Sequence, residues 1–374
     1  MKFVVSSSEM STCLQSASKV IIGKSVMPIL DNILLEAKND ELYATASDVE
    51  TTIIVKIELE SLEEDGKITI PTKLLLDFLR ECPEQPLHFD INTDTATVKI
   101  TSENGEYSIV GAKAEDYPEI NNMDKESNVF MSSCGLILDG ILKTDFAMAN
   151  DVHRPQMNSI LFEMNEDNLS FVSSDAHKLV RYKRFDSQNE IGTYSFMLPR
   201  KPATLLKNIL PKDDTELKLS FNAKSACVEF GAYKMICTLI EGKFPNYESV
   251  IPKNNPKKVI VNRRDLTNAL RRVSILANQA SKLVKFELSG GNIVLSAQDF
   301  DYSMSGHESI RCQYDGDPIV IGFKSSFLLE IISNIDTEDV AIELSESTRP
   351  GLFLPYESEN KNSDLLMLLM PMMV

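Results

Sequence analysis

Tryptophan is absent from the sequence, and aromatic residues make up only 7% of its 374 residues. Cysteine is scarce as well: there are six, with no CxxC pair and no other metal-ligand spacing. This pattern excludes a disulfide-stapled fold and a zinc site, so the cysteines are expected to be buried, reduced thiols of a cytosolic protein. We therefore predict no metal and no cofactor.

Long hydrophobic runs are also missing. The apolar stretch Leu365–Val374 has ten residues, whereas a membrane span needs about 20, so it is expected to be a buried strand. Residues Met1–Met10 lack the apolar segment of a signal peptide. With 43% hydrophobic and 25% charged residues, the chain is predicted to be soluble, folded and multidomain.

Positive charge is in short supply: 38 basic against 55 acidic residues give a net charge of −17. The total argues against a polyanionic partner, but the six predicted helices together carry +7, which leaves −24 elsewhere. Helices that share one side could therefore face phosphates, although for any single helix the simpler interpretation is that lysine and arginine favour helices. Because no basic recognition helix or aromatic stacking platform is present, such contacts would not depend on base sequence.

Catalytic motifs are lacking too, with no phosphate-binding glycine loop, no nucleophile elbow and no HExxH. Asp175 and His177, together with His153, could suggest a base or a metal site. However, Asp48 and Asp299 hold the same place as Asp175 in two similar stretches. The aspartate is therefore predicted to cap a turn, and we do not expect an enzyme.

What the sequence does contain is a threefold repeat. Residues 32–51, 158–178 and 282–302 each contain an apolar strand, a polar turn, a second strand and an aspartate. The aspartates recur at intervals of 127 and 124 residues. The chain is therefore interpreted as one unit of domain size used three times.

Two helices and a closing strand pair complete each unit. The first helix shows apolar spacing at i, i+3, i+4 and i+7, with Met10, Cys13, Leu14 and Ala17 in the first copy and Leu266, Ala269, Leu270 and Val273 in the third. The second helix is predicted to start at Pro71, Pro199 and Gly322. These elements predict an α+β fold with helices on an antiparallel sheet, in domains 1–125, 126–253 and 254–374. A row of like domains in a soluble protein usually curves until it closes.

Several ordered motifs then point to a family: MKF at the start, KSVMPIL at 24–30, SDAHKL at 174–179, FPNY with VIP at 244–252, and MPM at 370–372. In these the whole chain resembles the bacterial DNA polymerase III beta subunits, or sliding clamps. The resemblance implies a head-to-tail homodimer that closes into a ring of six domains around double-stranded DNA. It also implies loading by a clamp loader, and docking of the polymerase III core, other polymerases and repair proteins through short linear peptides.

The resemblance further assigns site residues. A peptide-binding groove between the second and third domains would use Met157, Ser174, His177, Lys178, Leu179, Pro245, Val250, Phe327, Thr348, Pro350, Met370, Pro371 and Met372. The DNA-facing residues would be Lys24, Lys73, Arg80, Arg154, Gln156, Arg200 and Lys201. The dimer interface would involve Tyr107, Ile109, Ile275 and Leu276.

Methionine suits such a groove because its flexible, polarizable side chain accepts different anchors. The chain departs from the family pattern at Ala176, Ser249 and Met373, so the polar rim of the groove is expected to differ. One alternative is a non-catalytic repeat scaffold that binds protein partners without encircling DNA. Retention on circular DNA would separate that scaffold from a clamp.

Overall fold

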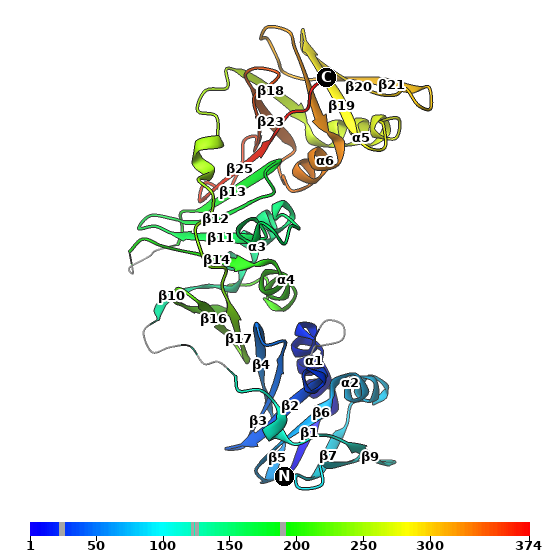
Figure 1. Cartoon of the computed structure of the whole chain (residues 1–374), viewed down its shortest axis with the longest axis vertical. Helices are drawn as coiled ribbons and strands as arrows, with labels where there is room; N and C mark the ends of the chain where they lie inside the picture. Colours follow the sequence, from blue (N-terminus) through cyan, green and yellow to red (C-terminus); the bar gives the residue numbers. More distant parts are fainter. Residues whose placement is uncertain (22–26, 121–122, 124–126, 188–191) are drawn as a thin grey trace. The chain divides into compact units, whose positions relative to one another are not determined.

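The structure is a computed structural model. It describes residues 1–21, 27–120, 123, 127–187 and 192–374. These form two compact units, one of residues 1–138 and 204–239, the other of residues 139–203 and 240–374. Each unit combines antiparallel sheets with helices (Figure 1), which confirms the predicted α+β class.

The first unit contains a five-stranded sheet, in the order β5-β1-β7-β8-β9, and an eight-stranded sheet, in the order β10-β15-β16-β17-β4-β3-β2-β6. Their strands are β1 (Lys2–Ser6), β2 (Asn32–Lys38), β3 (Glu41–Ser47), β4 (Thr51–Glu58), β5 (Ser61–Glu64), β6 (Gly66–Pro71), β7 (Pro86–Asn92), β8 (Thr97–Thr101), β9 (Glu106–Val110), β10 (Asn128–Ser133), β15 (Glu216–Phe221), β16 (Ser225–Phe230) and β17 (Tyr233–Thr238).

The second unit also contains an eight-stranded sheet, in the order β14-β11-β12-β13-β25-β24-β23-β18, and a four-stranded sheet, in the order β21-β20-β19-β22. Their strands are β11 (Ser159–Met164), β12 (Leu169–Ser174), β13 (Lys178–Arg184), β14 (Tyr194–Pro199), β18 (Lys257–Asn262), β19 (Leu283–Ser289), β20 (Asn292–Asp299), β21 (Met304–Arg311), β22 (Ile319–Lys324), β23 (Asp339–Leu344), β24 (Gly351–Pro355) and β25 (Ser363–Leu369).

Helices pack in pairs: α1 (Ser7–Ala17) with α2 (Thr72–Glu81), and α5 (Arg263–Ser274) with α6 (Ser325–Ser333) (Figure 1). The chain passes from one unit to the other within α3 (Cys134–Thr144) and again within α4 (Arg200–Ile209). In the described residues, no helix is long and apolar enough to cross a lipid bilayer.

The predicted helix faces are found in the structure. All four apolar positions of α5 are buried, namely Leu266, Ala269, Leu270 and Val273. The side chain of Asn262 accepts hydrogen bonds from the N–H groups of Arg264 and Asp265, which fixes the start of α5. In α1 the match is incomplete, because Cys13 is only half-buried.

The second helices start one residue later than predicted in the first two repeats. Pro71 pairs with Asn32 at the end of β6, and Pro199 pairs with Ser159 at the end of β14. Each proline therefore ends a strand, and the helix begins at the next residue. A proline fits this junction because a backbone N–H at this position would have no partner in the helix, and proline has none.

The threefold hairpin is confirmed as β2–β3, β11–β12 and β19–β20. The aspartate after each hairpin caps a turn, as predicted. Asp48 Oδ1 accepts from Thr51 N at 2.6 Å, Asp175 Oδ1 from Lys178 N at 2.8 Å, and Asp299 Oδ1 from Asp301 N at 3.0 Å. A side-chain carboxylate that binds its own backbone in this way stabilises a turn, which accounts for the recurrence of the residue.

The cysteines are less uniformly buried than predicted. Cys134, Cys227 and Cys237 are buried, whereas Cys13, Cys82 and Cys312 are half-buried, and all six are free thiols. Burial raises the pKa of Cys237 to about 12 and that of Cys227 to about 11. These two thiols are therefore protonated at neutral pH and unreactive.

Candidate peptide-binding groove

The C-terminal strand is held beside the turn of the middle repeat. Strand β25 pairs with β13 from Lys178↔Leu369 to Arg184↔Ser363. Beyond the strand, Met370 N donates to His177 O and Met372 N donates to Gly322 O, each at 2.8 Å. Two segments distant in sequence thus fix the last residues of the chain, and only Leu365–Leu369 form the buried strand that was predicted.

Three predicted groove residues line one pocket of about 480 Å³. Thr348, Pro371 and Met372 form its walls, together with Val320, Ser347, Met373 and Val374. Met373 is 95% exposed and nearby Met370 is 39% exposed. Exposed methionines around a small hollow provide an adaptable apolar surface for a ligand side chain.

A second group of predicted residues surrounds Phe327 on α6. The Lys178 and Lys324 ammonium groups lie 4.3 and 4.4 Å from the centroid of the Phe327 ring. The imidazole of His177 stacks on the same ring at 5.9 Å. Cation–π and stacking contacts of this kind fix the position of the ring, so Phe327 is a preformed wall.

Lys178 is 5% exposed, and its ammonium group forms ion pairs with Asp175 Oδ2 at 3.0 Å and with Glu330 Oε2 at 2.9 Å. The contact with Glu330 ties β13 to α6. The sequence does not indicate this ion pair or the role of Lys324, because neither Glu330 nor Lys324 lies at a regular spacing from residues 174–179.

Beneath these residues lies an apolar layer. Leu179 packs there with Tyr247, Leu366 and Leu368, among others. Tyr247 donates to Glu163 Oε2 at 2.6 Å, and burial together with this hydrogen bond raises the pKa of the Tyr247 phenol. Tyr247 lies between Pro245 and Val250 in the sequence, and both of these are exposed, so the layer supports a surface that they present.

Not every predicted groove residue is on the surface. Ser174 is 7% exposed, and its hydroxyl donates to Lys178 O, while Leu179 is 3% exposed. These two side chains are therefore buried and do not line the predicted groove. Pro350 is half-buried next to β24, and Met157 lies in a short 3₁₀ turn, where its carbonyl accepts from Ala149 N.

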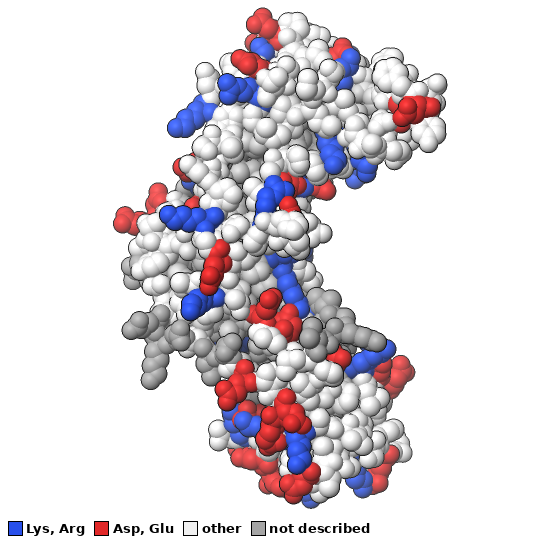
Figure 2. Space-filling model, in the orientation of Figure 1, with Lys and Arg blue, Asp and Glu red and all other residues white. Residues whose placement is uncertain are grey.

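The predicted DNA-facing residues differ in their exposure and in the ion pairs and hydrogen bonds that they form within the chain. Lys24 lies outside the described residues. Lys73 and Arg80 are exposed on α2, and Arg80 pairs with Asp77 at 3.1 Å. On the face of the first unit shown in Figure 2, acidic side chains gather over the strands around β2, β3 and β5.

In the second unit, Arg154 pairs with Asp151 at 2.8 Å, and Gln156 reaches the carbonyl of Glu241 at 3.5 Å. Arg200 donates to Asn158 Oδ1 and to the carbonyls of Met148 and Ala149, which anchors the loop before β11. Lys201 follows Arg200 in α4 and is half-buried.

The predicted interface residues form two surfaces, one in each unit. Tyr107 is 45% exposed on β9 and packs edge-on against Phe78, whereas Ile109 is 8% exposed and belongs to the core of its own unit. Just beyond α5, Ile275 is 71% exposed. The adjacent Leu276 is half-buried and fills the space beside Gly306, where a Cβ would lie 2.4 Å from Leu276 Cδ1.

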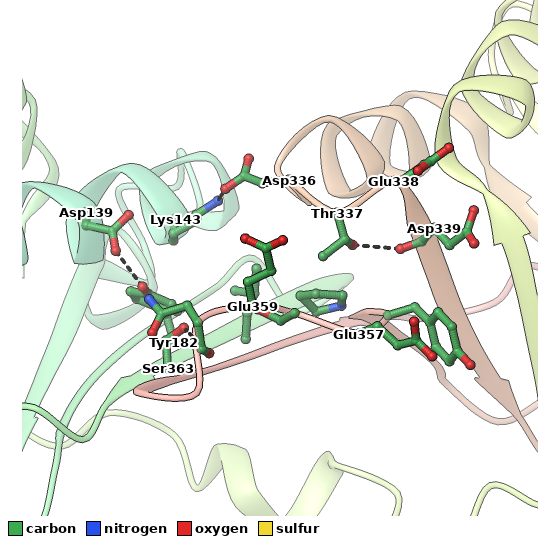
Figure 3. Close-up of a pocket in the computed structure, with 15 residues that line it drawn as sticks. Asp139, Lys143, Tyr182, Asp336, Thr337, Glu338, Asp339, Glu357, Glu359 and Ser363 are labelled. Carbon is green, nitrogen blue, oxygen red and sulfur yellow. Dashed lines mark hydrogen bonds and ion pairs between the residues drawn. The ribbon is translucent and has the colours of Figure 1, made fainter.

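A further hollow, of about 630 Å³, was not foreseen. Six of its fifteen lining residues are acidic, namely Asp139, Asp336, Glu338, Asp339, Glu357 and Glu359 (Figure 3). Lys143 points to Asp336 and Tyr182 to Asp139 across this hollow. Across the described residues, no three acidic, histidine or cysteine side chains are arranged to hold a metal ion.

Comparison with known proteins accounts for nearly the whole chain. Residues 1–121, 136–246 and 248–373 match, in order, the N-terminal, central and C-terminal domains of the DNA polymerase III beta subunit. The chain belongs to the DNA polymerase III beta subunit family. Both the predicted family and the predicted threefold clamp fold are therefore confirmed.

Relatives match this family member over nearly all of its sequence. The chain is 27% identical to the beta sliding clamp of Pseudomonas aeruginosa over 365 residues, which cover 97% of this chain and 98% of that one. It is 26% identical to the Vibrio cholerae beta sliding clamp, over 94% of this chain and 95% of the relative. The function of a DNA sliding clamp is thereby confirmed.

Solved structures agree with this. A P. aeruginosa sliding clamp crystallised with griselimycin matches with a TM-score of 0.94 at 26% identity, over 100% of both chains. A Bartonella birtlesii sliding clamp, also bound to griselimycin, matches with a TM-score of 0.92 at 26% identity, again over 100% of both chains.

Proposed function

We propose that this sliding clamp is a ring of two copies, joined head to tail, that encircles duplex DNA and tethers the replicative polymerase through the groove. Each copy contributes three clamp domains, at residues 1–125, 126–253 and 254–374. The role is non-catalytic, and its site is the cytoplasm. The observation that carries the proposal is the way in which the sheets continue from one repeat to the next.

The fourth strand of a repeat pairs with the last strand of the repeat that follows. Strand β4 of the first repeat pairs with β17, the last strand of the second, from Val55↔Tyr233 to Thr51↔Cys237. Strand β13 of the second repeat pairs in the same way with β25, the last strand of the third. This junction therefore occurs twice in one chain.

In the part of the chain that the structure describes, the corresponding strand of the third repeat has a partner on one side only. This fourth strand, β21, is an edge of the four-stranded sheet, and the last strand of the first repeat, β9, is an edge of the five-stranded sheet. An uncovered edge presents unpaired backbone N–H and C=O groups. A second copy supplies the missing strand at each edge, and a closed pair of copies leaves none of these edges unpaired.

The residues of β9 and β21 that would lie opposite each other can be inferred from the buried face of each strand. Ile109 of β9 faces the core of its unit, and Gly306 of β21 faces Leu276 next to α5. Opposed residues of an antiparallel pair share a face. With Met304 opposite Ile109, as Thr51 is opposite Cys237, the exposed residues Ser305 and Ser108 meet on the outer face.

Encirclement is needed because phosphate contacts are weak. Non-specific binding has a dissociation constant of roughly 10⁻⁴ to 10⁻⁶ M at physiological salt, so with fast association each contact lasts on the order of a millisecond or less. The net charge of −17 adds no general attraction to DNA. In the proposal, Lys73, Arg80, Arg154, Gln156, Arg200, Lys201 and Lys24 keep the duplex centred while the ring prevents escape.

Retention on DNA tests this function. The protein is loaded onto nicked circular DNA by a clamp loader, and the complex is separated from unbound protein. The DNA is then cut once. We expect the protein to remain on the circle and to leave after cutting. Equal loss from both forms would refute encirclement and favour the alternative, a repeat scaffold that binds proteins only.

The groove is proposed to bind short linear peptides of the polymerase III core, the clamp loader, other polymerases and repair proteins. Its support is the pocket at Thr348, Pro371 and Met372, together with the fixed ring of Phe327. Deleting Met370–Val374 removes two hydrogen bonds and part of the pocket wall. We expect the deletion to abolish binding of a polymerase-derived peptide while leaving the dimer intact, and unchanged affinity would refute the assignment.

A further inference from the structure

The turn after the repeated aspartate is longer in the third repeat than in the other two. In the first repeat Asp48 bonds to Thr51 across two residues, and in the second Asp175 bonds to Lys178 across two residues. In the third, Asp299 pairs with Met304, so four residues, 300–303, form the turn. The two additional residues are found only at the end of β20 that leads into the unpaired edge strand β21.

This longer turn carries two aromatic side chains that its own unit does not cover. Phe300 is 79% exposed and Tyr302 is 72% exposed, well above the exposed aromatic residues Tyr107, Phe185 and Tyr194. We call these two residues the aromatic tip. The β20–β21 hairpin projects beyond α5 and α6 of its own unit (Figure 1). Exposed aromatic residues grouped in this way are typical of a protein–protein contact.

The aromatic tip is firmly mounted. Asp299, just before it, is 1% exposed and accepts hydrogen bonds from Asn278 Nδ2 and Asp301 N. Ser303 N donates to Phe300 O at 3.3 Å and closes the turn. The base of the tip is thus hydrogen-bonded before any partner arrives, which lowers the entropic cost of binding.

We propose that the aromatic tip packs on a second copy of this chain, against the C-terminal end of β9, and so supplies apolar binding energy at the ring junction. The proposal rests on the ring proposed above. In an antiparallel β21–β9 pair, the start of β21 faces the end of β9, so the turn at 300–303 lies over Val110. Val110 is 71% exposed, so its apolar side chain is largely unburied within its own unit.

The charges near α5 and β21 support an apolar junction. Arg272, next to the β21 edge, already bonds Glu308 through both its Nε and one terminal nitrogen. This hydrogen bond with Arg272 lowers the pKa of Glu308. Because the pair is satisfied within its own subunit, it leaves little charge to hold the partner, and salt should weaken the junction only slightly.

The test compares the dimer dissociation constants of three proteins by sedimentation velocity. The first is the wild type, the second is Phe300→Ser/Tyr302→Ser, and the third is the control Val49→Ser. Val49 is 56% exposed at the corresponding turn of the first repeat, where the edge of β4 is already covered by β17. We expect the double variant to raise the dissociation constant at least about 100-fold, because each closed ring contains the junction twice, and the control to leave it unchanged.

A second measurement asks whether the tip and Val110 touch. Val110→Ser is combined with the tip variant, and the two effects are tested for additivity. If the tip and Val110 touch, the fold-change in the dissociation constant of the combined variant will be smaller than the product of the two separate fold-changes. A combined fold-change at least about fivefold below that product supports direct contact. At concentrations where every protein is a monomer, thermal unfolding should be unchanged in each variant, since all three side chains are exposed in the single copy.

Failure of this proposal can be told from failure of the ring itself. If Ile275→Asp dissociates the dimer while the tip variant does not, the ring stands and the tip proposal is overturned. If the wild type is a monomer at every concentration, both are overturned. A wild-type dissociation constant that rises more than about tenfold between 50 and 500 mM salt would also contradict an apolar tip contact, since salt screens charges.

Discussion

Ile275 offers the sharpest test of the two-copy ring. It follows the last turn of α5, is 71% exposed, and is next to Leu276, which packs at Gly306 of the edge strand β21. Aspartate at this position should leave folding unchanged, because the isoleucine side chain is largely outside the core of its own unit. In the ring, the same side chain would be buried against the partner.

The magnitude follows from burial. Burying an isoleucine side chain stabilises a complex by about 1.5–3 kcal/mol, and a ring of two copies contains the junction twice. Loss of both contacts amounts to roughly 3–6 kcal/mol, or about two to four powers of ten in the dimer dissociation constant. Burial of an unpaired carboxylate would add to this loss.

Sedimentation velocity over a concentration series measures this constant, and chemical denaturation measures the stability of the single copy. Val152→Asp serves as the control, because Val152 is 85% exposed and lies in a loop that belongs to neither edge strand. A dissociation constant of the Ile275→Asp variant within threefold of wild type would refute the reasoning. So would an equal effect of the control.

Two further predictions concern the turn beside the groove. Ala176 has φ +72°, a conformation that is unfavourable for residues with a Cβ. Ala176→Gly should therefore raise the free energy of unfolding by about 1 kcal/mol. A lower stability of the variant in a urea titration would count against this. Lys178→Met removes the buried ammonium group that bridges Asp175 and Glu330, and should lower the free energy of unfolding by about 2–3 kcal/mol. It should also weaken peptide binding, because Phe327 loses a cation that holds its ring. A variant that unfolds and binds the peptide like the wild type would contradict the proposed role.

The repeat and much of the fold could be predicted because they depend on local patterns. The face of α5 follows from the spacing of Leu266, Ala269, Leu270 and Val273, all of which are buried. The turn role of Asp175 followed from its recurrence at Asp48 and Asp299. These features involve residues within a few positions of one another, where helix periodicity and turn chemistry act directly.

The junctions could not be predicted from spacing. Thr51 pairs with Cys237, and Lys178 with Leu369; no local pattern identifies partners so far apart. For the same reason the ion pair between Lys178 and Glu330 and the burial of Leu179 became evident only once β25 lay beside β13. The resemblance supplied the predicted groove residues as a set, but it did not show that Ser174, Lys178 and Leu179 are buried.

The central claim is that two copies encircle DNA, and a covalently sealed ring tests it most directly. A Ser108→Cys/Ser305→Cys variant is assembled on circular DNA, oxidised and then denatured, with each single-cysteine variant as a control. We predict that the sealed protein stays with the circle through denaturation and is released when the circle is cut. Release from the uncut circle, with both junctions cross-linked, would contradict the account.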